Sequence, residues 1–284
     1  MSDAASIERL RAPFGVEARG LDLAAPDCTR EEFDALRRAF DDHHLLLLRG
    51  PVISGEAQIS FVARFGPLIA ERGLWGYVSN VREDGIVREG PLLFHSDFAF
   101  TQSPVWAISL HAWEVPSSGS TTMFARATAD SLPADLRARL DGKRVVNLYD
   151  FGRPDDQPMR LAEAAPGSPH TEHPIIRRHP RTGVEVVMAN ELHTDHVVGV
   201  PAAESAALLA DLFAALYDDS NTYRHEWSVG DLVLWDNVAL HHGRRGFDPA
   251  ERRTLQRVTL GLHTPSESVP GLADLLAAAH TRLS

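Results

Sequence analysis

Two residue types that suit metal binding stand two positions apart in the segment 94–98 (FHSDF). In an extended strand, residues i and i+2 point to the same face, so His95 and Asp97 can contact one ion while their neighbours point away. One imidazole and one carboxylate are two thirds of the 2-His-1-carboxylate triad, which leaves positions on iron(II) open for a co-substrate and oxygen. His-x-Asp is a short pattern, however, and a short motif is only a hypothesis.

A second copy of the pattern, His193 with Asp195, has His196 beside it and competes for the same role. The chain contains 14 histidines, and imidazole serves many purposes besides metal binding. A single histidine therefore carries little weight. The choice between the two copies depends on the residues that could complete the site.

The residues late in the chain provide that context. The segment 230–237 (GDLVLWDN) precedes His241 and His242, and an arginine-rich stretch follows them. This run resembles the taurine dioxygenase and dichlorophenoxyacetate dioxygenase (TauD/TfdA) family, in which the distal iron-binding histidine follows the Trp of a Trp-Asp-Asn segment by seven residues. His242 stands seven residues after Trp235, so the resemblance implies that His242 is a ligand and His241 its neighbour.

The resemblance also decides between the two His-x-Asp copies. The family separates its proximal pair from the distal histidine by most of the domain; 147 residues separate His95 from His242, whereas 49 separate His193 from it. We therefore predict an iron(II) site formed by His95, Asp97 and His242. The carboxylate of Asp97 argues against halogenation, because related halogenases have a small residue in its place that admits halide.

Two further positions imply a site for 2-oxoglutarate. The family carries an arginine eleven residues after the distal histidine, where this chain has Arg253. A guanidinium suits the far carboxylate of 2-oxoglutarate because it offers two parallel charge-assisted hydrogen bonds. The family also places a threonine on that carboxylate, within a Gly-Gly-Asp-Thr-like segment. The segment 116–124 (PSSGSTTMF) occupies this place and makes Thr122 the match, although Ser120 and Thr121 stand where the family often has Gly-Asp.

Arg257, fifteen residues after His242, is the most informative residue for the substrate. In the taurine branch the matching arginine holds the sulfonate, so we expect a small carboxylate, sulfonate or sulfate ester; the alternative is an ion pair between Arg257 and an acidic side chain. Leu92 replaces an asparagine of the taurine branch, which favours a more apolar pocket and poor use of taurine. Other candidate substrate contacts are Trp75 and Tyr77, for which core packing is the alternative, and His193 and His196, for which a structural role is the alternative.

The chemistry that the resemblance implies is oxidation of an unactivated C–H bond by oxygen and 2-oxoglutarate, with release of succinate and carbon dioxide. Hydroxylation is the usual outcome, and desaturation, ring formation or C–O cleavage are alternatives. A zinc hydrolase could use the same three ligands with an activated water, but it has no use for an arginine at the position of Arg253. A non-catalytic binding protein is a further alternative, and it predicts no iron site.

Local patterns predict the elements that must position these residues. Thr29 and Glu32 form a capping-box pattern ahead of a helix that runs to Asp42. Stretches without sustained periodicity at 69–90 and 151–173 are expected to be loops that could close over the site as lids. Helices are also predicted over 54–65, 131–140, 202–217 and 271–283, and strands over 45–48, 105–113, 144–149, 174–178, 184–189, 231–235 and 254–262.

Early helices followed by many short strands predict a mainly β fold with buttressing helices. The resemblance implies a double-stranded β-helix core, also called a jelly roll or cupin-like core. We expect residues 1–284 to form a single domain.

Composition bounds the surroundings of the protein. The net charge is −11 and there is one cysteine, which disfavours a nucleic-acid partner and anionic membranes and rules out an internal disulfide. No apolar run approaches the roughly 18 residues of a membrane span, and the N-terminus lacks the apolar core of a signal peptide. We expect a cytoplasmic homo-oligomer that acts on a small molecule.

Overall fold

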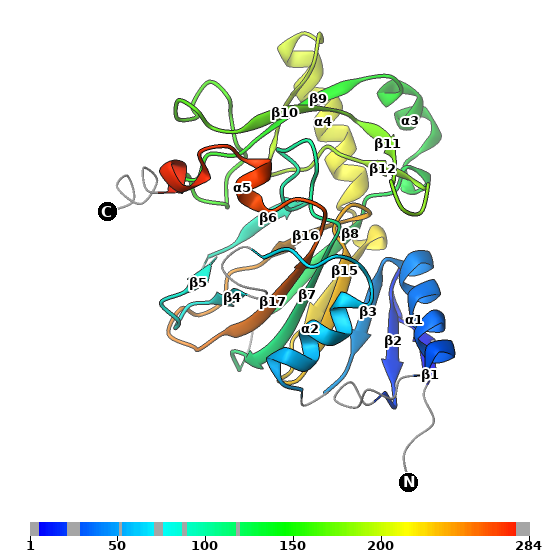
Figure 1. The fold of residues 1–284 in the computed structure, drawn as a ribbon. Helices are drawn as coiled ribbons and strands as arrows, with labels where there is room; N and C mark the ends of the chain where they lie inside the picture. The colour runs from blue at the N-terminus through cyan, green and yellow to red at the C-terminus, as the bar shows by residue number, and fades with distance from the viewer. Residues whose placement is uncertain are drawn as a thin grey trace.

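A computed structural model of the protein describes residues 6–21, 29–50, 53–70, 76–86, 90–117 and 120–276 (Figure 1). Its centre is a sandwich of two sheets. The larger sheet has the strand order β1 (Ser6–Arg9), β2 (Val16–Arg19), β3 (Leu45–Leu48), β15 (Leu232–Asp236), β7 (Ala107–Glu114), β17 (Thr254–Leu260), β4 (Gly76–Ser79) and β5 (Gly85–Ile86). The smaller sheet has the order β14 (Thr222–Glu226), β8 (Thr121–Arg126), β16 (Leu240–Arg244) and β6 (Leu92–His95).

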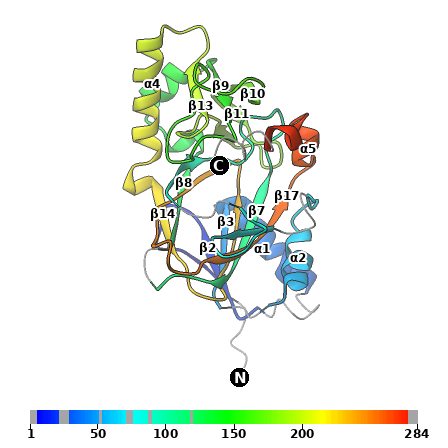
Figure 2. The same cartoon turned by 90° about the vertical axis from the view of Figure 1, so that its left-hand side faces the viewer.

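A second half of the molecule packs beyond the sandwich, where Figure 2 shows α4 beside β9, β10 and β13. Its core joins α3 and α4 to a three-stranded sheet of order β10-β9-β13 through Leu136, Val145, Val197 and Leu212. The strands are β9 (Arg144–Leu148), β10 (His170–Pro174), β11 (Ile176–Arg178), β12 (Glu185–Val187) and β13 (Thr194–Val197). The labelled helices and helical turns of the described residues are α1 (Arg30–His43), α2 (Gly55–Ala63), η1 (Ala129–Ser131), α3 (Ala134–Leu140), α4 (Ala202–Leu216), η2 (Asp219–Asn221) and α5 (Pro265–Ser268).

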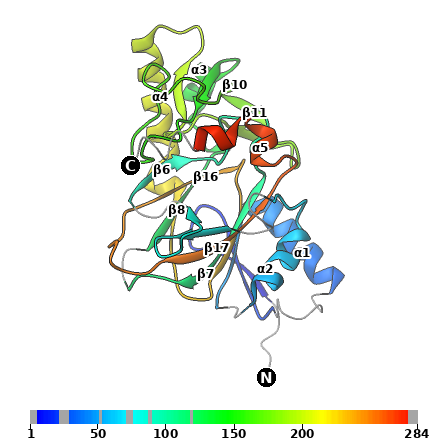
Figure 3. The same cartoon turned by 60° about the vertical axis from the view of Figure 1, so that its left-hand side comes forward.

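The run of leucines in β3 shows how the layers are held together. Successive side chains of a strand point to opposite faces. Leu46 and Leu48 accordingly pack with α1 and α2, which cover the outer face of the large sheet (Figure 3), whereas Leu45 and Leu47 pack into the space between the two sheets. Because both faces are covered, an unbroken apolar run is stable here, and the predicted buried strand over 45–48 is confirmed.

The paired strands bring residues far apart in the chain together. β6 and β16 are antiparallel neighbours, and His95 is the direct register partner of His242. On the other side of β16, Thr122 of β8 is the partner of Arg244. Arg257 lies on β17 in the opposing sheet, where it pairs with Gly76 and Leu110. The space between the sheets is therefore lined from both sides by residues that the sequence singled out.

Most predicted elements are present, and the mainly β architecture with buttressing helices is confirmed. The capping box at Thr29 and Glu32 is formed, and it begins α1. The loop predicted over 69–90 is partly wrong, because β4 and β5 extend the large sheet there; these strands are too short to show a period. The loop predicted over 151–173 ends early because β10 begins at His170. Of the predicted helix over 271–283, residues 277–283 lie outside the described part.

The segment between β9 and β10 is tied to the second half of the molecule rather than projecting from it. Met159 is fully buried, and its N–H donates to the carbonyl of Leu192 at 2.8 Å. The carboxylate of Asp150 accepts from the backbone N–H groups of Gly152 and Ala165, both at 2.9 Å. The lid role of this segment and of 69–90 stays a prediction. Among the described residues, no helix is long and apolar enough to cross a membrane.

Candidate active site

The three predicted metal ligands, His95, Asp97 and His242, meet at one point between the sheets. Nε2 of His95 lies 2.9 Å from Oδ1 of Asp97, and Nε2 of His242 lies 3.6 Å from the same oxygen. One ligand atom from each of the three side chains lies within 4.8 Å of the other two. Within the described part of the chain, this is the group of histidine, cysteine and acidic residues arranged to hold a metal ion.

The surroundings of Asp97 and His242 favour the protonation states that a metal requires, whereas the hydrogen bond to Asp97 outweighs burial and raises the pKa of His95 in the metal-free protein. Burial opposes a charge on Asp97, but Arg257 and the hydrogen bond from His95 outweigh burial and hold the pKa of Asp97 well below its usual value. Burial and the neighbouring His95 hold the pKa of His242 well below its usual value, so its imidazole is neutral. An ionised carboxylate and a neutral imidazole are the forms that bind a divalent cation.

A backbone contact fixes which nitrogen of the His95 ring faces the site. Nδ1 of His95 lies 2.9 Å from the carbonyl of Leu93, which accepts its proton and leaves Nε2 toward Asp97. The neighbouring His241 points away from the centre: its Nε2 donates to the carbonyl of Val187 at 3.2 Å, and its Nδ1 lies 3.1 Å from the hydroxyl of Tyr217. Burial lowers the pKa of His241 to about 3.

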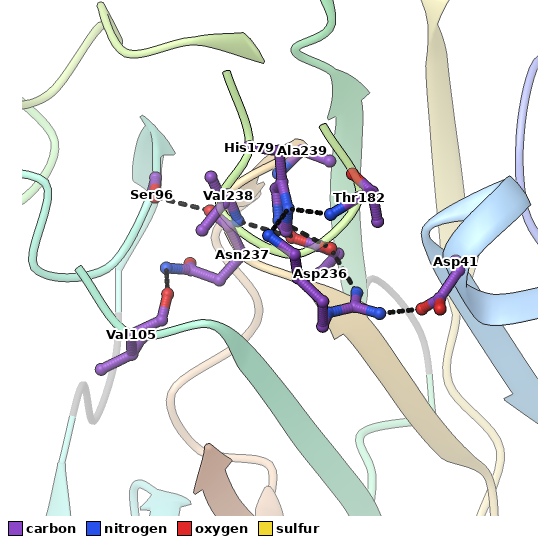
Figure 4. A network of polar contacts seen from close by, with 10 residues as sticks. Asp41, Ser96, Val105, His179, Thr182, Asp236, Asn237, Val238 and Ala239 are labelled. Carbon is purple, nitrogen blue, oxygen red and sulfur yellow. Dashed lines mark hydrogen bonds and ion pairs between the residues drawn. The ribbon is translucent and has the colours of Figure 1, made fainter. Parts of the chain in front are cut away.

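Asn237 clamps the segment that carries Asp97, and Figure 4 shows its contacts with Ser96 and Val105. Its Oδ1 accepts the backbone N–H of Asp97 at 2.9 Å, and its Nδ2 donates to the carbonyls of Asp97 at 3.1 Å and of Val105 at 2.9 Å. Its own carbonyl accepts from the Ser96 hydroxyl at 2.6 Å. Because Asn237 leads into β16, which carries His242, these four bonds set the spacing between the proximal and distal sides of the metal site.

A buried ionic network supports the same turn. The carboxylate of Asp236 accepts from the backbone N–H groups of Val238 at 3.0 Å and Ala239 at 3.1 Å. It also contacts Nε2 of His179 and lies 3.0 Å from Nη2 of Arg181, which in turn pairs with Asp41 of α1 (Figure 4). Although burial opposes its charge, the hydrogen bond from His179 lowers the pKa of Asp236.

Replacing Asn237 with alanine is expected to weaken binding of a divalent metal about 10- to 100-fold, the usual effect of losing a group that orients a metal ligand. Titration of metal-free protein with Co²⁺, followed by its visible absorption, would measure this. Ser96→Ala is the matched control, because it removes one bond to Asn237 and leaves the contacts of its amide. Equal affinities for Asn237→Ala and the unchanged protein would show that the clamp does not set the ligand geometry.

A single cavity joins the three candidate ligands to four of the eight other predicted site residues, Leu92, Thr122, Arg253 and Arg257. Its polar lining includes two arginines, Arg244 and Arg253, that are almost fully buried. Its apolar lining comes from both sheets. The residues that line the cavity are Val78, Leu92, His95, Asp97, Ile108, Leu110, Thr122, Trp235, His242, Gly243, Arg244, Arg253 and Arg257.

Arg253 is a desolvated cation with hydrogen-bonding capacity to spare. Its side chain belongs to a residue only 2% exposed, and Nη1 has no hydrogen-bond partner among the described residues. Nε donates to the Ser120 hydroxyl at 3.3 Å. Burial and the nearby charge of Arg244 lower the pKa of Arg253 to about 9. A buried cation that lacks an anionic partner is costly, so this position favours the binding of an anion.

Arg257 lies against the candidate metal ligands. Its Nη2 is 2.7 Å from Oδ2 of Asp97, and its Nε donates to the Thr259 hydroxyl at 3.1 Å. In this structure Arg257 therefore forms an ion pair with an acidic side chain, which was the alternative to substrate binding. The partner is Asp97, one of the candidate metal ligands. Its guanidinium faces the cavity that contains Leu92.

The remaining predicted substrate contacts are distributed differently. His193 is buried, and its ring stands edge-on to that of His95 with centroids 5.7 Å apart. Two further predicted residues lie outside the cavity lining in this structure. The ring of Tyr77 packs on Trp113 and under Arg82, because Val78, its neighbour in β4, is the one that faces the cavity. His196 is bound to Asp195 with a side chain 42% exposed, outside the cavity lining. Trp75 lies outside the described residues.

Sequence reasoning missed several residues at the site. Arg244 could have been found, because in a strand it shares a face with His242 two positions earlier. The Trp-Asp-Asn segment locates His242 by its offset, but it does not reveal that the side chain of Asn237 binds the backbone of Asp97. Ser120 and Trp227 carry no pattern that marks them, since their contacts depend on strands distant in the chain.

Comparison with known proteins shows the family of this chain. The family model for the taurine catabolism dioxygenase TauD, TfdA family matches residues 6–259. The chain is 35% identical to the alpha-ketoglutarate-dependent 2,4-dichlorophenoxyacetate dioxygenase of Cupriavidus pinatubonensis, over 80% of this chain and 88% of that protein. It is 31% identical to the pentalenolactone F synthase of Streptomyces avermitilis, over 94% of this chain and 97% of that protein.

Solved structures show the same fold. A taurine dioxygenase from Burkholderia xenovorans superposes with a TM-score of 0.76 at 26% identity, covering 96% of this chain and 99% of that one. The structure of AAD-2 in complex with Mn(II) and N-oxalylglycine superposes with a TM-score of 0.77 at 25% identity, covering 92% and 98%. The jelly-roll core is confirmed by these neighbours. From the family match and the two relatives above 30% identity, the chain belongs to the TauD/TfdA family and is an iron(II)- and 2-oxoglutarate-dependent dioxygenase.

Proposed function

We propose that this dioxygenase oxidises an unactivated C–H bond of a small organic anion, and that His95, Asp97 and His242 hold the iron. The observation that carries the proposal is the convergence of these three side chains with two cavity-facing arginines, Arg253 and Arg257. With iron(II) and 2-oxoglutarate bound, such a centre uses oxygen to functionalise the C–H bond and releases succinate and carbon dioxide. The two imidazoles and one carboxylate fit iron(II) and leave part of its coordination sphere free.

We assign 2-oxoglutarate to the side of the cavity where Arg253 and Thr122 lie. Arg253 supplies a buried guanidinium whose Nη1 lacks a partner among the described residues, and the far carboxylate of 2-oxoglutarate would neutralise it. Thr122 is buried beside it on β8 and offers a hydroxyl. A zinc hydrolase would leave this desolvated cation without a role.

We assign the anionic group of the substrate to Arg257. Because this guanidinium already touches Asp97, an anion that it binds would be held within reach of the metal centre. Apolar residues, Leu92 and Val78 among them, line the same cavity and would cover the hydrocarbon part of the substrate. The names of relatives point the same way: they act on 2,4-dichlorophenoxyacetate, (S)-phenoxypropionate and sulfate esters, all of which are anionic.

Anaerobic reconstitution with iron(II) and 2-oxoglutarate tests the proposed centre, since the chelate gives a metal-to-ligand absorption band. A panel of carboxylates, sulfonates and sulfate esters, each with an uncharged isostere, would then be scored by substrate-dependent succinate release. We expect turnover of charged members with an apolar body and poor turnover of taurine. Product analysis would separate hydroxylation from desaturation, ring formation and C–O cleavage. Absence of the absorption band would contradict the proposal.

Replacing Arg257 with methionine is expected to raise KM for the anionic substrate about 100-fold, because a charge-assisted pair of hydrogen bonds is lost. The concentration of co-substrate that gives half-maximal turnover should change by less than about threefold, since 2-oxoglutarate is assigned to Arg253. Arg252→Met is the matched control, because Arg252 is exposed and pairs with Glu114 at the surface. If Arg257→Met turned over charged and uncharged substrates as the unchanged enzyme does, the assignment of Arg257 would be wrong.

A further inference from the structure

The hydroxyl of Thr122 receives a hydrogen bond from a tryptophan beneath the cavity. Nε1 of Trp227 lies 2.9 Å from Oγ1 of Thr122, and both residues are buried. Trp227 directly follows β14, which pairs with β8 so that His225 and Thr122 are register partners. Within the described part of the chain, this is the one hydrogen bond that the Thr122 hydroxyl makes.

The direction of this bond follows from the chemistry of its two groups. An indole N–H can only donate, whereas a threonine hydroxyl has one proton to donate and two lone pairs. The Thr122 oxygen must therefore be the acceptor, and Trp227 occupies one of its lone pairs. The hydroxyl proton is not used in this contact and is turned away from the indole N–H. It remains available for an acceptor in the cavity.

We propose that Trp227 is a positioning residue for the co-substrate, which aims the Thr122 hydroxyl proton at the far carboxylate of 2-oxoglutarate. This inference rests on the proposed function, because it assumes that Thr122 faces that carboxylate. A rotating hydroxyl that must be oriented at the moment of binding gives a weaker hydrogen bond than one already fixed. Trp227 itself touches neither metal nor substrate and acts through Thr122.

Trp227 is held firmly enough for such a role. Its backbone N–H donates to the carbonyl of Ser120 at 3.2 Å, and its ring stands edge-on to that of His225 with centroids 4.5 Å apart. His225 lies 3.3 Å from the buried carboxylate of Asp231. Trp227 is therefore fixed by a hydrogen bond from its backbone and by a ring contact on one side of its indole.

Ser120 connects this arrangement to Arg253. Its carbonyl accepts from the backbone of Trp227, and its hydroxyl accepts from Nε of Arg253 at 3.3 Å. Both groups assigned to the far carboxylate, the guanidinium and the Thr122 hydroxyl, are thus oriented by donors and acceptors outside the cavity. The family often has glycine at the position of Ser120. A glycine has no hydroxyl, so it could not accept this hydrogen bond from Arg253.

The test compares two keto acids that share the metal-chelating end and differ at the other: 2-oxoglutarate, and 2-oxopentanoate, which has no far carboxylate. Under anaerobic conditions with iron(II), the Kd for each is measured from the absorption band. In Trp227→Phe we expect 2-oxoglutarate to bind about tenfold more weakly, the equivalent of one hydrogen bond to a charged group. Binding of 2-oxopentanoate should stay within about twofold. A purely structural role would weaken both keto acids alike, and that result overturns the inference.

Three further variants make the outcome specific. Thr122→Val should weaken 2-oxoglutarate selectively, and adding Trp227→Phe to it should cause no further loss, because the group through which Trp227 acts is already absent. Trp113→Phe changes a partly exposed tryptophan with no assigned role and should bind both keto acids normally. If Trp227→Phe does not fold, benzothienylalanine at position 227 keeps the ring shape and removes only the N–H donor.

The failure of this inference can be distinguished from failure of the proposed function. A selective effect in Thr122→Val without one in Trp227→Phe would leave the 2-oxoglutarate site in place and overturn the positioning role. If Thr122→Val showed no selective effect, Thr122 would not contact the far carboxylate of 2-oxoglutarate. The assignment of Thr122 and the positioning role of Trp227 would then both be wrong.

Discussion

Asp97→Ala is expected to abolish oxygenase turnover and to weaken iron(II) binding by at least about 100-fold, since loss of a mere orienting group already costs roughly 10- to 100-fold. The carboxylate is the one anion among the three candidate ligands, and its Oδ1 lies between Nε2 of His95 and Nε2 of His242. Without it, two imidazoles would face the ion together with the positive charge of Arg257. Iron(II) affinity measured anaerobically, together with 2-oxoglutarate decarboxylation, would check this.

The same substitution has a second expected effect on the protein without metal. Arg257 would lose the carboxylate that lies 2.7 Å from its Nη2 in a buried setting, and breaking one partner of such a pair destabilises a fold by about 3 kcal/mol. Chemical unfolding of the metal-free protein would measure the change. A variant that lost iron binding but kept the stability of the original chain would show that the Asp97–Arg257 pair contributes little to folding.

Asp195→Ala is the matched control, because it removes the aspartate of the second His-x-Asp copy. Asp195 pairs with His196 and accepts from the backbone N–H of Leu161, away from the cavity lining. Iron affinity and turnover should stay close to those of the unchanged enzyme. Loss of iron binding in Asp195→Ala, with retention in Asp97→Ala, would reverse the choice between the two copies.

Arg253→Met is expected to weaken binding of 2-oxoglutarate on the order of 100- to 1000-fold, because two charge-assisted hydrogen bonds are lost. Its effect on stability should have the opposite sign. In the absence of co-substrate Arg253 is a buried cation whose Nη1 has no partner among the described residues, and replacing it with an apolar side chain removes that penalty. The metal-free variant should therefore be at least as stable as the unchanged protein.

Unfolding curves and co-substrate titrations on the same preparations would test both halves of this prediction. The neighbouring Arg252 again serves as the control, since its exposed side chain binds Glu114 and should be neutral in both assays. A variant at Arg253 that lost stability and kept normal 2-oxoglutarate affinity would identify Arg253 as a structural residue.

The strands and helices with strong local signals could be predicted from sequence. The capping box at Thr29 and the leucine run over 45–48 depend on neighbouring residues, and both are confirmed. The short strands β4 and β5 could not be predicted, because β4 is defined by its pairing with β17 and β5 by its pairing with β4, rather than by their own composition. A local sequence pattern reports only local structural preference, which is weak in strands of two to four residues.

The candidate site divides in the same way. The three candidate metal ligands could be predicted from residue types and from offsets to a family motif, and the structure places them together. The sequence could not tell that Tyr77 faces away while Val78 faces the cavity, because either parity of a short strand fits the pattern. Contacts such as Trp227 with Thr122 or Asn237 with Asp97 join residues about a hundred or more positions apart, and no spacing rule describes them.

The direct pairing of His95 with His242 across two neighbouring strands has a consequence for how this chain tolerates change in length. Inserting or deleting one residue inside β6 or β16 would turn an imidazole to the opposite face of the sheet and separate the ligands, even if the strands still paired. Residues added in the segments before β6 would leave that opposition intact. Insertions and deletions that preserve oxygenase activity should therefore lie outside β6 and β16.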